Sequence, residues 1–162
     1  MNNPGRKLLV ALGALVLLPL AVLAQSCENY HSEGDCRFDL RRDYKIYSQS
    51  HSVSMSPVDT VELNMVFYGQ NDYILSFCTH RKMYPVHFIL KDTHTGKVLY
   101  DNEEDDFIES LGLGFDVTKS IIIVVNVLAR ESSEEEIRGN VGCLGLLIQY
   151  KNYPKKKVKL QM

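Results

Sequence analysis

Residues 59–77 read DTVELNMVFYGQNDYILSF, and this stretch decides the class of fold. Polar side chains stand at positions 62 and 64, between the apolar side chains Val61, Leu63, Met65 and Phe67. The alternation resumes at residues 73–77, after the turn-like sequence GQND. A period of two is typical of a β-strand with one buried face. We therefore predict a hairpin of two strands joined by the four-residue loop 69–72.

Similar patterns recur further along the chain. Residues 86–90 and 97–101 flank the turn sequence THTG at 93–96, which predicts a second hairpin. Residues 120–129 read SIIIVVNVLA and are apolar on both faces apart from Asn126. Such a run is typical of a central strand that is covered on both faces.

The remaining signals complete an all-β chain. Residues 141–151 predict the last strand, in which Gly142 and Gly145 mark a bulge or the close approach of another backbone. Helix is indicated at residues 132–138 alone, and a solvated acidic loop explains that segment equally well. The sequence thus predicts a single antiparallel β-sandwich of about seven to nine strands with at most one short helix. Shorter strands are predicted at residues 44–47, at 53–55, and at 115–117 after the chain breakers Gly112 and Gly114.

The N-terminus has the pattern of a secretory signal peptide. Arg6 and Lys7 precede an apolar run over residues 8–23, and small residues follow its end. We predict cleavage after Ala24, with an uncleaved N-terminal anchor as the alternative. Removing the first 24 of the 162 residues leaves 138, a normal size for one domain. We therefore expect an exported protein, periplasmic, cell-surface or extracellular, with a signal peptide (1–24), a β-sandwich domain (25–151) and a lysine-rich tail (152–162).

Four cysteines in an exported chain predict two disulfides: Cys27, Cys36, Cys78 and Cys143. Of the three pairings, we favour Cys27–Cys36, which closes a short loop, together with Cys78–Cys143 between two distant strands. Acylation of Cys27 is one alternative, because this cysteine directly follows the apolar run as in a bacterial lipoprotein. A zinc ion held by Cys27, His31 and Cys36 is another, although their spacing differs from the paired Cys-x-x-Cys of common zinc sites.

The charge distribution excludes a general nucleic-acid-binding role. The net charge is −2, and it becomes −4 once Arg6 and Lys7 are removed with the signal peptide. The lysines of the C-terminal tail are typical of a solubilising segment that protects an edge strand, and contact with an anionic surface is the alternative. Trp is absent, and core or rim packing explains the tyrosines at strand and strand-end positions, namely Tyr44, Tyr47, Tyr68, Tyr73, Tyr84 and Tyr100.

Catalytic motifs are missing from the sequence. It contains no Gly-x-Ser-x-Gly elbow, and the spacing of its five histidines predicts no base beside a nucleophile. The acidic run at residues 101–106 is the best candidate for chemistry, because calcium is bound by clustered carboxylates on loops. A solvated loop is the alternative explanation for such a run of like charges. The predicted calcium ligands are Asp101, Glu103, Asp105 and Asp106, and no other cofactor is expected.

Three segments carry a resemblance to known proteins: FYGQNDY at 67–73, YPVHF at 84–88 and CLG at 143–145. With the cysteines spaced as here, they resemble small exported proteins of Bacteroidota that have no assigned activity. The order of strands and turns also resembles the pre-peptidase C-terminal type of bacterial β-sandwich. The resemblance implies compartment and fold, and it supplies no catalytic residue.

These observations favour a non-catalytic role. We expect an exported binding or accessory module, stabilised by disulfides, with an unknown protein or glycan partner in the envelope or outside the cell. A lipid-anchored envelope protein acylated at Cys27 and a small secreted hydrolase are the alternatives. Contact with a membrane is expected only if Cys27 is lipidated.

Overall fold

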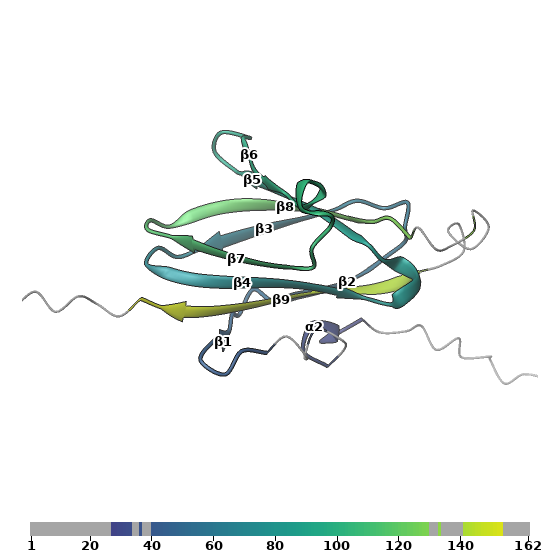
Figure 1. The fold of residues 1–162 in the computed structure, drawn as a ribbon, viewed down its shortest axis with the longest axis horizontal. Coiled ribbons are helices and arrows are strands. Elements are labelled where there is room, and N and C mark those ends of the chain that lie inside the picture. The colour runs from purple at the N-terminus through teal and green to yellow at the C-terminus, as the bar shows by residue number, and fades with distance from the viewer. Residues whose placement is uncertain (1–26, 34–35, 37–39, 130–132, 134–140, 154–162) are drawn as a thin grey trace, which may run out of the picture.

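The computed structural model describes residues 27–33, 36, 40–129, 133 and 141–153. Within these residues, nine β-strands form two antiparallel sheets that pack face to face as a β-sandwich (Figure 1). The described residues contain one α-helix, the four-residue α2 (Tyr30–Glu33), which contacts β9. The predicted all-β sandwich is therefore confirmed.

We call the two layers sheet A and sheet B. In sheet A, β9 pairs with β1, β2 and β4, and β4 also pairs with β7. Its strands are β1 (Lys45–Ile46), β2 (His51–Met55), β4 (Asn71–Thr79), β7 (Ser110–Phe115) and β9 (Gly142–Asn152). Sheet B has the order β3-β8-β5-β6, with β3 (Val61–Phe67), β8 (Lys119–Val127), β5 (Val86–Asp92) and β6 (Val98–Asp101). Two 3-10 turns, η2 (Arg81–Met83) and η3 (Asn102–Asp105), follow β4 and β6.

The core lies between the two sheets. Phe77 of β4 and Phe88 of β5 stack across this interface, with ring centroids 4.2 Å apart and ring planes at 21°. Phe67 of β3 and Tyr73 of β4 meet edge to face in the same core, with ring centroids 4.9 Å apart. All four rings are almost completely buried. Burying a side chain of this size contributes about 1.5–3 kcal/mol, so aromatic packing joins the two sheets.

The first predicted hairpin is wrong. Strands β3 and β4 exist, but β3 pairs with β8 in sheet B and β4 pairs with β9 and β7 in sheet A. The chain therefore crosses from one sheet to the other at residues 68–70. Gly69 permits this crossing, because a Cβ there would lie 2.7 Å from the carbonyl oxygen of Asp116. Alternation shows which face of a strand is buried, but it does not identify the partner strand.

Of the other strand predictions, some are confirmed and some differ from the structure. The hairpin of β5 and β6 is confirmed, and β8 is central in sheet B as expected. Only one face of β8 is covered, however, because Ile122, Val124 and Asn126 are half-buried on the outer face. β7 begins earlier than predicted and contains both Gly112 and Gly114, since an edge strand tolerates glycine.

Several predictions concern segments that lie wholly or partly outside the described residues. The signal peptide at 1–24 lies outside the described residues, and so does the lysine-rich tail beyond residue 153. The predicted helix at 132–138 lies outside them apart from Ser133. The predicted last strand is confirmed as β9, which runs to Asn152.

The two disulfides join the N-terminal segment to sheet A. They pair Cys27 with Cys143 and Cys36 with Cys78, with Cα–Cα distances of 5.3 and 5.2 Å. The predicted pairing of Cys27 with Cys36 and of Cys78 with Cys143 is therefore wrong. Acylation of Cys27 and zinc binding by Cys27, His31 and Cys36 both need a Cys27 sulfur that is outside a disulfide. The disulfide to Cys143 therefore contradicts both alternatives.

The register of sheet A explains this pairing. Cys78 stands opposite Gly145 in the β4–β9 pair, so Cys143, two residues from Gly145, lies on the same face of the sheet. Each of these cysteines takes a partner from the segment that covers this face. A Cβ on Gly145 would lie 2.9 Å from the Cα of His31 and from the sulfurs of Cys36 and Cys78. The predicted close approach of another backbone at Gly145 is thus confirmed.

The turn between β5 and β6 is organised by Asp92. Its Oδ1 accepts hydrogen bonds from the backbone N–H groups of His94 and Thr95, both at 3.0 Å. Its Oδ2 lies 3.3 Å from the Nζ of Lys119 on β8. The Thr95 amide makes the largest contribution to lowering the pKa of Asp92, and the His94 amide and Lys119 act in the same direction.

We expect Asp92 to make stability depend on pH in the acidic range. Its pKa is lower in the folded chain than in the unfolded chain, so the ionised carboxylate stabilises the fold above its ordinary pKa. That contribution is lost as the pH falls below about 4. Melting curves of Asp92→Asn should therefore show a smaller decrease in Tm on acidification than the parent protein. The exposed Asp116→Asn is the control, and an unchanged decrease in Asp92→Asn contradicts this assignment.

Candidate functional site

A pocket of about 340 Å³ opens at one end of the sandwich, where residues next to β1 meet the start of β4 and the end of β9. We call it the tyrosine pocket. Its volume lies within the range of small-molecule sites, about 300–1,000 Å³. It is lined by Ile46, Tyr47, Ser48, Tyr68, Asn71, Tyr73, Tyr150 and Asn152.

Two buried tyrosines fix the wall of this pocket. Tyr47 donates a hydrogen bond from its hydroxyl to the carbonyl oxygen of Val66, which ties the segment after β1 to the edge of sheet B. The hydroxyl of Tyr73 donates to the carbonyl oxygen of Tyr68 at 3.1 Å and accepts from the Tyr68 N–H at 2.9 Å. The turn that carries Tyr68 is thereby held in place by Tyr73 of sheet A.

Two further tyrosines line the pocket with rings that are not fully buried. The side chain of Tyr68 is 56% exposed, and Tyr150 is half-buried. Both rings are edge-on to Tyr47, at 88° and 69° to its plane. Within the described part of the chain, their hydroxyl groups form no hydrogen bond. These hydroxyls are therefore available to bind a ligand.

Asn71 is the least satisfied polar group of the pocket. It is only 8% exposed, and its Nδ2 donates to the carbonyl oxygens of Tyr68 and Gly69 at 3.2 and 3.1 Å. Its side-chain oxygen is buried and has no hydrogen-bond partner among the described residues. Leaving a buried acceptor unpaired costs about 1–3 kcal/mol. Such a group is expected where a ligand or a water completes the site.

The tyrosine pocket carries no ionisable group other than its phenols. None of its lining residues is Asp, Glu, Lys, Arg or His. Burial raises the pKa of Tyr47 to about 12 and also raises the pKa of Tyr73. Both phenols therefore stay neutral at physiological pH. The pocket suits an uncharged ligand, and it holds no group that exchanges protons near neutral pH.

Part of this pocket is predictable from the sequence. Tyr47, Tyr68 and Tyr73 were assigned to core and rim packing, and that assignment is confirmed for the two buried rings. Tyr150 and Asn71 were not singled out. They reach the pocket because β9 pairs with both β1 and β4, and no local pattern predicts this pairing.

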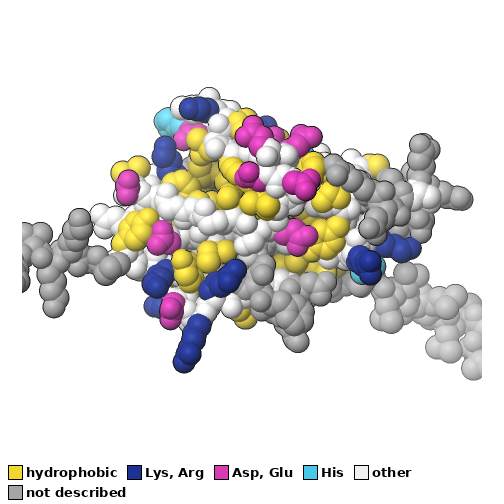
Figure 2. Space-filling view, viewed as in Figure 1, with side chains coloured by type: hydrophobic (Ala, Val, Ile, Leu, Met, Phe, Trp, Pro, Cys, Tyr) yellow, Lys and Arg dark blue, Asp and Glu magenta, His cyan; other side chains and the backbone are white. Residues whose placement is uncertain are grey.

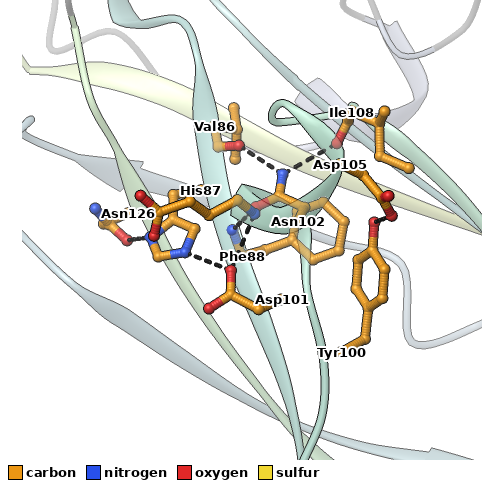
Figure 3. Close-up of polar contacts among 10 residues, drawn as sticks. Val86, His87, Phe88, Tyr100, Asp101, Asn102, Asp105, Ile108 and Asn126 are labelled. Atoms are coloured by element: carbon orange, nitrogen blue, oxygen red, sulfur yellow. Dashed lines mark hydrogen bonds and ion pairs between the residues drawn. The ribbon is translucent and has the colours of Figure 1, made fainter.

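The predicted calcium ligands separate into different environments (Figure 3). Asp101 and Glu103 lie close to His87, so that one potential ligand atom of each falls within 4.8 Å of the others. Asp105 instead accepts a hydrogen bond from the hydroxyl of Tyr100 at 2.7 Å. Asp106 follows η3 in a left-handed conformation, with φ of 54°. Calcium binding by all four carboxylates stays a prediction.

His87 lies at the centre of this polar cluster. Its Nε2 is 2.9 Å from the Oδ1 of Asp101, and its Nδ1 is 3.1 Å from the Oδ1 of Asn126 on β8. Burial opposes ionisation of Asp101, but the Glu103 amide and His87 outweigh it and lower the pKa of Asp101. Both ring nitrogens of His87 therefore contact oxygen atoms of neighbouring side chains.

A buried asparagine fixes the loop that carries these carboxylates. Asn102 is fully buried and accepts a hydrogen bond from the Phe88 N–H at 2.8 Å. Its Nδ2 donates to the carbonyl oxygens of Val86 and Ile108, at 2.9 and 3.0 Å (Figure 3). The loop between β6 and β7 therefore has a defined shape. Figure 2 shows acidic side chains gathered over the upper centre of one face of the molecule, with Lys and Arg side chains around its edges, several of them at the lower left.

Comparisons with known proteins leave the family open. No family model matches the chain, and no curated protein matches it. A solved structure that resembles it is PliG of Aeromonas hydrophila, a periplasmic inhibitor of g-type lysozyme. The identity is 12%, the TM-score is 0.44, and the match covers 69% of this chain and 91% of PliG. This likeness is too distant to assign the chain to a family. Within its described residues, no helix is long and apolar enough to cross a membrane.

Proposed function

We propose that this chain is an exported, non-catalytic binding domain that recognises a neutral glycan through the tyrosine pocket. The observation that carries the proposal is a pocket lined by aromatic rings, amides and hydroxyl groups, with no charged side chain. Available hydroxyls on Tyr68 and Tyr150 supply further hydrogen bonds. Aromatic rings beside amide and hydroxyl groups suit the apolar faces and the hydroxyl groups of a sugar.

Export is supported by the N-terminal pattern and by the cysteines. The apolar run at residues 8–23 is typical of a signal peptide. Two disulfides persist in an oxidising compartment, such as the periplasm or the extracellular space. A partner in the envelope or outside the cell is therefore proposed.

A non-catalytic role is supported by the chemistry of both polar regions. The tyrosine pocket is lined by no Asp, Glu, Lys, Arg or His, and both ring nitrogens of His87 contact oxygen atoms of Asp101 and Asn126. A hydrolase needs an acid or base that can move a proton to or from its substrate. Binding without turnover is the function that this arrangement favours.

The neighbouring surface allows a ligand longer than one sugar ring. A second pocket of about 320 Å³ lies between the start of β2 and the edge strand β3. Ser48 lines both pockets, so they lie next to each other. An oligosaccharide is thus a better match than a monosaccharide.

We expect Tyr68→Ala to weaken glycan binding at least tenfold, equivalent to about 1.4 kcal/mol. The ring of Tyr68 is exposed, so its removal deletes a binding surface with little effect on folding. Tyr150→Phe should give a smaller loss, because it removes one hydroxyl. Arrays of neutral hexose and N-acetylhexosamine oligosaccharides identify the ligand, and calorimetry then measures the affinities.

Matched controls are available on sheet B. Leu99→Ala truncates an exposed side chain of β6, and Tyr100→Phe removes one hydroxyl from the same strand. Both should bind the glycan like the parent protein. The proposal fails if none of the arrayed oligosaccharides binds, or if Tyr68→Ala binds them as tightly as the controls. Binding of a neutral peptide at the same residues would replace the glycan with a protein partner.

A further inference from the structure

The polar cluster on sheet B combines three metal-binding side chains from different parts of the chain. His87 belongs to β5, Asp101 ends β6, and Glu103 lies in η3. One ligand atom from each side chain lies within 4.8 Å of the other two. We infer that His87, Asp101 and Glu103 form a binding site for a divalent transition-metal ion of the zinc class. This site lies on different elements from the tyrosine pocket and goes beyond the proposed glycan binding.

The distances allow an ion to be bound with small movements. Three atoms that are no more than 4.8 Å apart fit within a circle whose radius is about 2.8 Å. Zinc binds histidine nitrogen and carboxylate oxygen at about 2.0–2.2 Å. Carboxylate rotations that shift each ligand by less than about 1 Å therefore bring all three into bonding range.

Asn126 supplies an observation from outside the cluster. It stands opposite His87 in the β5–β8 pair, and its side-chain oxygen lies 3.1 Å from Nδ1. With an ion bound between Nε2 and Asp101, the Nδ1–H donates to the Asn126 oxygen and the Nε2 lone pair is directed at the ion. Metal-binding histidines are almost always oriented in this way by a hydrogen bond to their other nitrogen.

The surroundings hold two of the ligands before an ion arrives. Oδ1 of Asp101 accepts a hydrogen bond from the Glu103 N–H at 3.0 Å, and Asn102, the residue between them, is fully buried. Phe107 packs edge-on to the imidazole of His87, with centroids 5.8 Å apart. His87 and Asp101 are therefore held in place, whereas the exposed Glu103 side chain is ordered only when an ion binds.

The ligand types determine the class of ion. Calcium prefers six to eight oxygen ligands, whereas this site offers one imidazole nitrogen and two carboxylates. Imidazole suits zinc, copper and nickel. Asp105 is engaged by Tyr100 and is absent from the group of close ligand atoms, which further favours a transition metal over calcium. Water would complete the coordination, because three protein ligands leave a position open.

Titration calorimetry of the metal-free protein, purified without a polyhistidine tag, tests this site with Zn²⁺ and Ca²⁺ as probes. We expect one Zn²⁺ per chain, with affinity at least tenfold weaker in His87→Gln and in Glu103→Gln. The matched controls Glu104→Gln and His94→Gln should retain the parent affinity, because neither residue belongs to the cluster. Addition of Zn²⁺ should also shift the Nε2 resonance of His87 in ¹⁵N spectra.

Two results overturn the inference. One is an absence of Zn²⁺ binding by the folded parent protein. The other is equal Zn²⁺ affinity in the parent protein and in His87→Gln, which would place the ion elsewhere. Calcium binding that does not depend on His87 would instead support the calcium site predicted at Asp101, Glu103, Asp105 and Asp106.

Discussion

The paired variant Cys27→Ala/Cys143→Ala is expected to lose about 5 kcal/mol of unfolding free energy, the larger of the two disulfide effects. The Cys27–Cys143 bond joins residues 116 positions apart, so it restricts the unfolded chain strongly. Cys36→Ala/Cys78→Ala, with a separation of 42, should lose about 4 kcal/mol. Because domains are stable by only about 5–15 kcal/mol, removal of both bonds should unfold most of the protein at 37 °C. Urea denaturation of each variant measures these losses.

The same variants test the pairing itself. Cys27→Ala/Cys143→Ala should contain no titratable thiol, because Cys36 and Cys78 remain bonded to each other. The control Cys27→Ala/Cys36→Ala removes one cysteine from each bond. It should leave Cys78 and Cys143 without their native partners. Intact mass after alkylation distinguishes the two variants without reduction. A stable Cys27–Cys36 disulfide in peptide maps of the parent protein would contradict the pairing described above.

Asn102→Ala is expected to destabilise the fold by about 3–5 kcal/mol. The fully buried Asn102 side chain accepts from Phe88 and donates to Val86 and Ile108. Its truncation leaves a buried N–H and a buried carbonyl of β5 without partners, and each such group costs about 1–3 kcal/mol. Chemical denaturation measures the loss. The exposed Asn64→Ala on β3 is the control, with an expected change within about 0.5 kcal/mol.

This variant also separates folding from binding. The loop between β6 and β7 depends on Asn102, so Zn²⁺ affinity should fall in Asn102→Ala even though all three ligands remain. Glycan binding should change little, because the tyrosine pocket is built from β1, β4, β9 and the turn after β3. A free-energy change in Asn102→Ala no larger than in Asn64→Ala would show that these three hydrogen bonds contribute little. Equal Zn²⁺ affinity would show that the site does not need the fixed loop.

Local patterns predicted most strands because burial on one face imposes a period of two. The alternation at 61–67 and 86–90 corresponds to β3 and β5, and the turn THTG joins β5 to β6 as expected. The predictions that were wrong concern which strands pair with each other. The pattern at 73–77 correctly marks part of β4, but its pairing with β9, some seventy residues later, left no local signal.

The residues of the two candidate sites were likewise not all predictable from local sequence patterns. Asp101 and Glu103 were recognised as potential ligands from their chemistry, but His87 lies fourteen residues before Asp101 and joins them only through the β5–β6 pair. Asn126 reaches His87 from β8. For the tyrosine pocket, Tyr150 joins Tyr47 and Asn71 only because β9 lies between β1 and β4 in sheet A.

The sequence by itself determined the all-β class, the strand positions in the alternating segments and the presence of two disulfides. These properties depend on side-chain periodicity and residue type, which are local. Tertiary structure alone decided the sheet assignment of β3 and β4, the disulfide partners and the residues that surround Asn71 and His87. These properties depend on which faces meet in the sandwich, because a contact between distant residues forms only after both strands have taken their places in a sheet.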